Sequence, residues 1–237
     1  MKSLIGWLLI PAIAAFSPIG CVKQEAPIGA DVRGQIAEAH GIEALGTIQK
    51  IQYTFHQRGD DRTVRRFWIW EPESDRVTYK AGDYQPAVSY RREDLPATAS
   101  DTVKQIDRWF LHDSYWLILP FRVAWDHRAQ VADMGLCRTP LAGESARCVN
   151  VVYPAKIKGH IIGDAYKLFL DGNYRILEAV YQPEDAPRKA AALRWTQYRY
   201  VGPLALSLKR EDGQGRARVW FSGVGVQVEG NKWYWAD

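Results

Sequence analysis

The chain has 237 residues, 47% of them hydrophobic and 12% aromatic, and its 31 basic and 27 acidic side chains give a formal net charge of +4. The positive charges are scattered, with short doublets such as Arg65-Arg66 and Arg91-Arg92, whereas nucleic-acid binding needs a dense basic surface. Composition and charge therefore argue against nucleic acid as a partner.

The first twenty residues have the pattern of an export signal. Lys2 gives a basic start, and the apolar run from Leu4 to Phe16 is shorter than the ~20 residues of a membrane span. Gly20-Cys21 resembles the end of a bacterial lipoprotein signal, in which a small residue precedes the cysteine that receives the lipid, although Pro18 stands where that pattern prefers Leu. We expect residues 1–20 to be the signal and Cys21 to be the lipid anchor. An ordinary secreted or soluble periplasmic protein is the alternative.

Residues 21–31 are polar and contain Pro27 and Gly29, which is typical of a tether between an anchor and a folded body. No Asp directly follows Cys21, and by resemblance to enterobacterial lipoproteins this favours the periplasmic face of the outer membrane. Residues 32–237 contain no second linker and no repeat, so we expect them to form a single domain.

Two segments are predicted to be helices. The first, near Val32 to Leu45, has apolar residues at helical spacing, but Gly34 and Gly41 weaken it. The second begins after Ser100, which can cap it, and carries an apolar stripe. Pro120 is expected to end whatever helix reaches it. The members of the stripe are Val103, Ile106, Trp109 and Phe110.

Most of the remaining sequence alternates as antiparallel strands do. Residues 51–57 place Ile, Tyr and Phe opposite polar neighbours, and residues 71–75 form a predicted turn between two aromatic-rich runs. Asp171-Gly172 is expected to take positive φ angles in a tight hairpin turn. Several such strands in succession predict a meander, and hence a curved sheet or barrel. On the strand before that turn, one face is shared by Tyr166, Leu168 and Leu170.

Three cysteines are an odd number for an exported protein. If Cys21 carries lipid, Cys137 and Cys148 remain, on either side of a polar loop with Pro140 and Gly143. We expect these two to form a disulfide across a hairpin or surface loop. A zinc site is disfavoured because no histidine stands at ligand spacing beside them.

Two stretches carry more apolar surface than a half-buried element needs. Residues 67–70, FWIW, are apolar on both faces of a strand, and the helical stripe continues into YWLILPF at residues 115–121. One explanation is an ordinary core, with the helix packed across the concave face of a twisted sheet. The other is a cavity between sheet and helix that takes an apolar ligand.

A family resemblance bears on this choice. The order of a lipoprotein-type leader, a short helix, FWIWEPESDRVTY, a W-F-x(4)-YWLxxPF segment and GDAYKLFLD resembles the outer membrane lipoprotein-sorting superfamily, the LolA- and LolB-like proteins, over roughly Thr47 to Leu208. The resemblance implies an α+β fold, an incomplete antiparallel β-barrel covered by short helices. Its apolar hollow would receive acyl chains of a lipid or lipoprotein. The loop between the two later cysteines departs from the best-known members.

The matching segments supply the candidate ligand-binding residues. What the resemblance implies for them is a place in the wall or lid of the hollow, and Phe110 of the helical stripe joins them. The candidates are Trp68, Trp70, Phe110, Trp116, Leu119, Phe121, Tyr166 and Leu168.

Catalysis is not expected. Residues 143–147, GESAR, lack the last glycine of the G-x-S-x-G nucleophile elbow. His112 and Asp113 are neighbours on a predicted helix and should point apart, and His56, His127 and His160 stand alone. We expect no cofactor and no metal. A third class of function is an interaction protein with a filled core, which docks envelope protein partners through a sheet edge or exposed aromatic surface.

Overall fold

The computed structural model of the protein describes residues 31–59, 61–82, 85–95, 99–153, 164–183 and 190–236. From Asp31 onward the chain forms one compact unit. Cys21, the expected signal and all of the expected tether except Asp31 lie outside the described residues. None of the described helices is long and apolar enough to cross a membrane.

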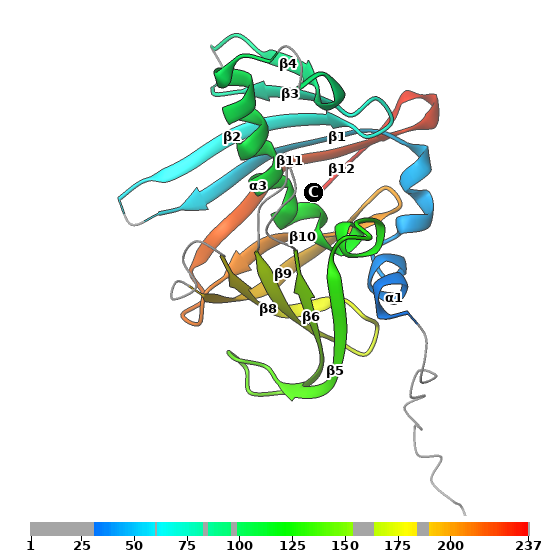
Figure 1. Ribbon diagram of the computed structural model, residues 1–237, viewed down its shortest axis with the longest axis vertical. Coiled ribbons are helices and arrows are strands. Elements are labelled where there is room, and N and C mark those ends of the chain that lie inside the picture. Colours follow the sequence, from blue (N-terminus) through cyan, green and yellow to red (C-terminus); the bar gives the residue numbers. More distant parts are fainter. Residues whose placement is uncertain are drawn as a thin grey trace, which may run out of the picture. The chain divides into compact units, whose positions relative to one another are not determined.

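Within these described residues, twelve strands form one antiparallel sheet, whose arrangement Figure 1 shows. The alternation of apolar and polar residues predicts which side chains face inward: in the first strand, Ile51, Tyr53 and Phe55 are buried. The strands are β1 (Ile48–Arg58), β2 (Thr63–Glu71), β3 (Arg76–Lys80), β4 (Val88–Arg91), β5 (Gln130–Arg138), β6 (Ser145–Val152), β7 (Ala165–Leu170), β8 (Ile176–Gln182), β9 (Ala191–Val201), β10 (Leu204–Glu211), β11 (Ala217–Val228) and β12 (Lys232–Trp235).

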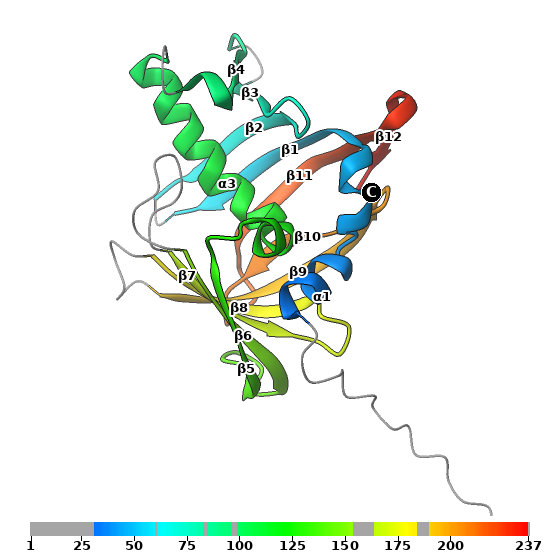
Figure 2. The same cartoon turned by 45° about the vertical axis from the view of Figure 1, so that its right-hand side comes forward.

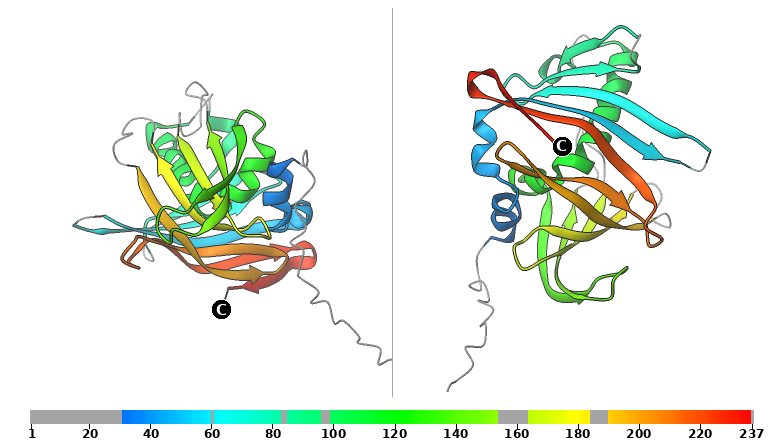
Figure 3. Two further views of the ribbon diagram at one scale, coloured as in Figure 1. Left: turned by 90° about the horizontal axis from the view of Figure 1, so that it is seen from below. Right: turned by 180° about the vertical axis from the view of Figure 1, so that it is seen from behind.

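The strand order is β4-β3-β2-β1-β11-β10-β9-β8-β7-β6-β5, with β12 paired to β11. The order starts at β4 and ends at β5, so the sheet bends without closing. Seen from below, it curves from β11 and β10 towards β7 and β6 (Figure 3). The expected α+β fold, an incomplete antiparallel barrel with helices, is confirmed.

One long helix, α3 (Asp101–Trp125), joins β4 to β5, the two edge strands. It crosses the inner side of the curved sheet (Figure 2). Its start follows the predicted capping, since the Ser100 hydroxyl accepts a hydrogen bond from the Val103 backbone N–H at 3.3 Å. The shorter helices are α1 (Val32–Glu38) and the 3₁₀ segments η1 (Ile42–Thr47), η2 (Arg92–Asp94) and η4 (Glu229–Asn231).

The helix expected near Val32 to Leu45 is two separate pieces, α1 and η1. Gly41 lies between them with φ of +90°, in the left-handed region. A Cβ at Gly41 would lie 2.3 Å from the backbone oxygen of Pro203, so the chain turns where only glycine fits. The single-helix prediction was therefore wrong.

Pro120 does not end the long helix, contrary to the prediction. The helix continues to Trp125 and accommodates the ring by a kink at Ile118, whose φ is −111° and ψ is 16°. Proline has no N–H, so it cannot donate to the carbonyl of Trp116 four residues earlier. The Arg210 guanidinium of β10 donates to that carbonyl instead.

The hairpin expected at Asp171-Gly172 exists between β7 and β8, but its turn differs from the prediction. The connection spans residues 171–175, and the positive φ, +61°, is at Tyr174. The Asp171 carboxylate accepts hydrogen bonds from the backbone N–H of Asn173 and Arg175 at 2.8 and 3.0 Å. This bonding stabilises a longer loop than the two-residue turn that we expected.

Cys137 in β5 and Cys148 in β6 form a disulfide, with Cα atoms 5.8 Å apart. The residues between the two strands form the loop that the polar sequence predicts. The bond therefore fastens the edge strand β5 to its neighbour.

Replacing both cysteines with serine is expected to lower the free energy of unfolding by about 2–3 kcal/mol, because the cross-link restricts the unfolded chain over a separation of 11 residues. Urea denaturation of the oxidised protein and of the double variant measures this. Free thiols at both positions in protein purified without reductant would contradict the pairing.

Candidate ligand-binding interior

The eight candidate ligand-binding residues all lie between α3 and the inner side of the sheet, in two packed clusters. We call the volume that these clusters fill the helix–sheet interior. The first cluster includes Trp68, Phe110, Trp116 and Phe121, with the half-buried Trp70 packed against it, and the second includes Leu119, Tyr166 and Leu168.

The second half of α3 is buried on every side. All side chains from Asp113 to Val123 are buried, whereas the first half exposes residues such as Arg108. A helix at a protein surface buries only one stripe, so burial all round means that this segment lies inside the fold. It fills space that the side chains of an open, curved sheet leave empty.

Side chains of the helix–sheet interior pack ring against ring. The Trp68 ring centroid lies 5.5 Å from that of Phe110, and the Trp116 centroid lies 5.3 Å from that of Tyr181. Both pairs are edge-to-face, a favoured arrangement of aromatic rings. In the described part of the chain, the candidate residues thus contact one another as a core does.

Two surface hollows lie elsewhere. The first is lined by residues of β2 and β3 and those just after β3, and the second by residues near η1, η4 and the β9–β10 turn. Neither lining includes a candidate residue. The linings are Arg65, Phe67, Lys80, Ala81 and Gly82 in the first, and Ala44, Thr47, Gly202, Pro203, Val228, Glu229 and Tyr234 in the second.

Asp113 fixes the middle of α3 to β2. Its fully buried carboxylate accepts hydrogen bonds from Arg66 Nε and Nη2, both at 2.6 Å, and from Trp68 Nε1 at 2.9 Å. His112 Nδ1 lies 2.9 Å from Asp113 Oδ1. The expectation that His112 and Asp113 point apart was therefore wrong, because the two side chains meet along the side of the helix.

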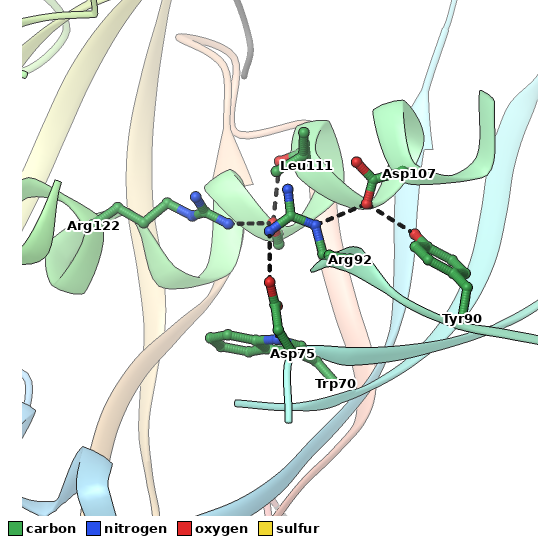
Figure 4. A network of polar contacts seen from close by, with 8 residues as sticks. Trp70, Asp75, Tyr90, Arg92, Asp107, Leu111 and Arg122 are labelled. Carbon is green, nitrogen blue, oxygen red and sulfur yellow. Dashed lines mark hydrogen bonds and ion pairs between the residues drawn. The ribbon is translucent and has the colours of Figure 1, made fainter. Parts of the chain in front are cut away.

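A second polar network fixes the start of α3 to the edge of the sheet (Figure 4). Arg92 donates to Asp107 at 2.8 Å and to Asp75 at 3.2 Å, and the Tyr90 hydroxyl donates to Asp107 at 3.1 Å. Burial and the nearby Asp107 carboxylate raise the pKa of Tyr90 above its ordinary value. The first half of α3 is thus held by polar contacts to β2 and to the β4–η2 segment.

The second half of α3 is held by Arg210, which is fully buried. Its guanidinium donates to the Trp116 carbonyl and to the Ser207 carbonyl and hydroxyl, and lies 3.5 Å from the Trp195 ring centroid. Burial lowers the pKa of Arg210 to about 9. Among the described residues, no carboxylate forms an ion pair with it.

Sequence reasoning did not identify Asp113, Arg122 and Arg210 as buried charged residues. Asp113 and Arg122 flank the apolar segment 115–121 that prompted the ligand hypothesis, and charges so close to that segment are the signal that was available. Arg210 follows alternating strand residues and gives no comparable signal. The described residues contain no group of three or more His, Cys, Asp or Glu that could hold a metal ion.

The chain has distant structural neighbours among known proteins. No family model matches the chain, and no curated protein matches it. A solved structure of a DUF1329 family protein from Desulfovibrio piger is similar, with 10% sequence identity and a TM-score of 0.42. The similarity covers 81% of this chain and 90% of that one. A likeness at this level carries no argument about ligand or activity.

Proposed function

We propose that the protein binds acyl chains of a lipid or lipoprotein in the helix–sheet interior, and acts in lipoprotein sorting or lipid transport in the cell envelope. One observation carries the proposal: a helix segment buried on all sides fills the inside of an open sheet. The interior is occupied, so an acyl chain enters when the second half of α3 gives up its place.

The contacts of α3 support a helix whose first half stays in place while its second half moves. Its first half is held by the carboxylates of Asp107 and Asp113. Its second half, residues 114–125, contains the kink at Ile118 and presents mainly apolar side chains, and its polar contact with the sheet is the hydrogen bond from Arg210 to the Trp116 carbonyl. An acyl chain would replace one set of apolar contacts with another, so the exchange costs little hydrophobic free energy.

Membrane anchoring through Cys21 at the periplasmic face of the outer membrane belongs to the same proposal. It would place the interior beside acyl-bearing substrates. The pattern around Gly20-Cys21 supports it.

Affinity for fatty acids is expected to depend steeply on chain length. Each methylene removed from water contributes roughly 0.8 kcal/mol, so shortening dodecanoate to decanoate should weaken binding about tenfold. Several of the ten tryptophans lie in the interior, so their fluorescence reports the titration.

A matched pair of variants tests the location. Leu119→Glu should suppress binding because Leu119 is 0% exposed in the interior, whereas Leu136→Glu should not, because Leu136 is 78% exposed on β5. Circular dichroism checks that both variants fold. Absence of saturable, length-dependent binding by the folded protein would reject the proposal.

A second candidate, a docking protein with a filled core, is favoured by the dense ring packing and by the edge strand β5. That strand is mostly exposed and carries Met134 and Leu136 on its surface. An exposed edge can add a strand from a partner. Stable co-purification of an envelope protein that Leu136→Glu disrupts, without acyl binding, would support this function.

A further inference from the structure

Three buried polar side chains meet beside the second half of α3. Arg122 and Tyr115 belong to α3, and Tyr153 directly follows β6. They are 6%, 2% and 4% exposed, respectively. Each has a buried polar atom without a hydrogen-bond partner: Arg122 Nε and both phenolic oxygens.

Arg122 has few contacts for a buried cation. Its side chain, labelled in Figure 4, donates a hydrogen bond to the Ser114 hydroxyl at 3.5 Å. Its guanidinium carbon lies 4.3 Å from the ring centroid of Tyr115. Within the described residues it forms no ion pair. A guanidinium has five N–H donors, and a buried charge without a counter-ion is costly, so this side chain favours an anion.

The two tyrosines face the same charge. Their ring centroids lie 5.4 Å apart in an edge-to-face pair. Burial raises the pKa of both Tyr115 and Tyr153, and the positive charge of Arg122 opposes that rise at each. The three groups are therefore within electrostatic reach of one another. Two neutral hydroxyls and a cation are the donors that an oxyanion needs.

The other charge that acts on both tyrosines is Asp126. Its carboxylate accepts hydrogen bonds from Arg128 Nε at 2.9 Å and Nη2 at 3.2 Å. The nearby carboxylate is thus paired with a cation other than Arg122.

The apolar surroundings of the tyrosines indicate what accompanies the anion. Tyr115 and Tyr153 belong to the same packed cluster as Leu119, Tyr166 and Leu168. These three are candidate acyl-binding residues, so an anion at Arg122 would lie next to the apolar volume.

We propose that Arg122, with the hydroxyls of Tyr115 and Tyr153, binds the oxyanion head of an acyl ligand, a carboxylate or phosphate, whose tail lies in the helix–sheet interior. This inference rests on the proposed acyl binding and names the ligand class: anionic single-chain or phosphate-bearing amphiphiles rather than neutral ones.

Head and tail can be tested separately by titrating the purified protein with dodecanoate, dodecyl phosphate, dodecan-1-ol and inorganic phosphate. The wild type should bind both anionic amphiphiles at least about tenfold more tightly than the alcohol. Arg122→Met should remove this difference and leave the affinity for the alcohol within about twofold. Arg108→Met, an exposed position on the same helix, is the matched control and should change neither affinity.

Smaller variants resolve the roles within the site. Tyr115→Phe and Tyr153→Phe should each weaken binding of the anionic amphiphiles several-fold without affecting the alcohol, because they remove one donor and keep the ring. Arg122→Lys should keep part of the preference. If Arg122→Met does not fold, as judged by circular dichroism, the two phenylalanine variants decide.

Equal affinity for dodecanoate and dodecan-1-ol in the wild type would overturn the head-group inference and leave acyl binding standing. No binding of any amphiphile would overturn both. Binding of inorganic phosphate that is as tight as that of dodecyl phosphate would show a site for a free anion, and would also overturn the inference.

Discussion

Replacing Asp113 with alanine is expected to lower the free energy of unfolding by about 3–5 kcal/mol. The carboxylate is 0% exposed and holds two nitrogens of Arg66, whose side chain is 12% exposed, and the indole N–H of Trp68. Its removal leaves a buried guanidinium and a buried indole donor without hydrogen-bond partners. The free energy of desolvating each donor is then no longer compensated.

Urea denaturation of the wild type and the Asp113→Ala variant measures the loss. Asp101→Ala is the control: Asp101 lies on the same helix with a fully exposed side chain, and its contact with Lys104 is long, at 3.7 Å. It should cost below about 0.5 kcal/mol. A loss below about 1 kcal/mol for Asp113→Ala would mean that α3 does not depend on this contact.

Stability is expected to fall by about 3 kcal/mol as the pH drops from 6.5 to 4, through His40 alone. Burial lowers the pKa of His40 from its ordinary 6.5 to about 4. Arg175 and Arg210 lower it further, whereas the Ile36 carbonyl and Asp171 act against the shift. Between these pH values the unfolded chain binds a proton at His40 that the folded chain does not, so acid favours unfolding.

The His40→Asn variant separates this contribution from that of the carboxylates. Asparagine does not titrate, and its amide can donate to the Ile36 carbonyl, which lies 2.7 Å from His40 Nδ1. The unfolding free energy of the variant should therefore depend less on pH between 6.5 and 4. His127→Asn, at an exposed position, should keep the wild-type dependence. Identical slopes in the wild type and His40→Asn would contradict the assignment.

The sheet was predictable because strand alternation is a local signal. Residues 51–57 and the run before Asp171 show which side chains face inward without knowledge of their partners. The errors arose where a distant group settles the local conformation. Pro120 stays in a helix because Arg210 of β10 replaces its missing donor, and Gly41 breaks a helix because the backbone at Pro203 lies against it.

The location of the candidate interior could be predicted from the sequence, but whether it is hollow or filled could not. The aromatic runs around Trp68 and Trp116 identify residues that must be covered on both sides, and the structure brings them together. Whether such residues surround a hollow or fill it depends on side chains from four or more strands. Buried charges are harder still to predict from sequence, since only its apolar neighbours distinguish Arg122 from an exposed arginine.

The disulfide between Cys137 and Cys148 limits how far a movement of α3 can spread. Only residues 126–129 separate α3 from β5, so a pull on the end of the helix acts on β5 at Gln130. An edge strand has a neighbour on one side alone, so tension at the end of β5 would break its hydrogen bonds to β6 one after another. The disulfide lies one residue before the opposite end of β5, so strand separation that starts at Gln130 would stop there. If α3 moves as proposed, the disulfide keeps β5 attached to β6, and the hydrogen bonds between the two strands can re-form in their original register.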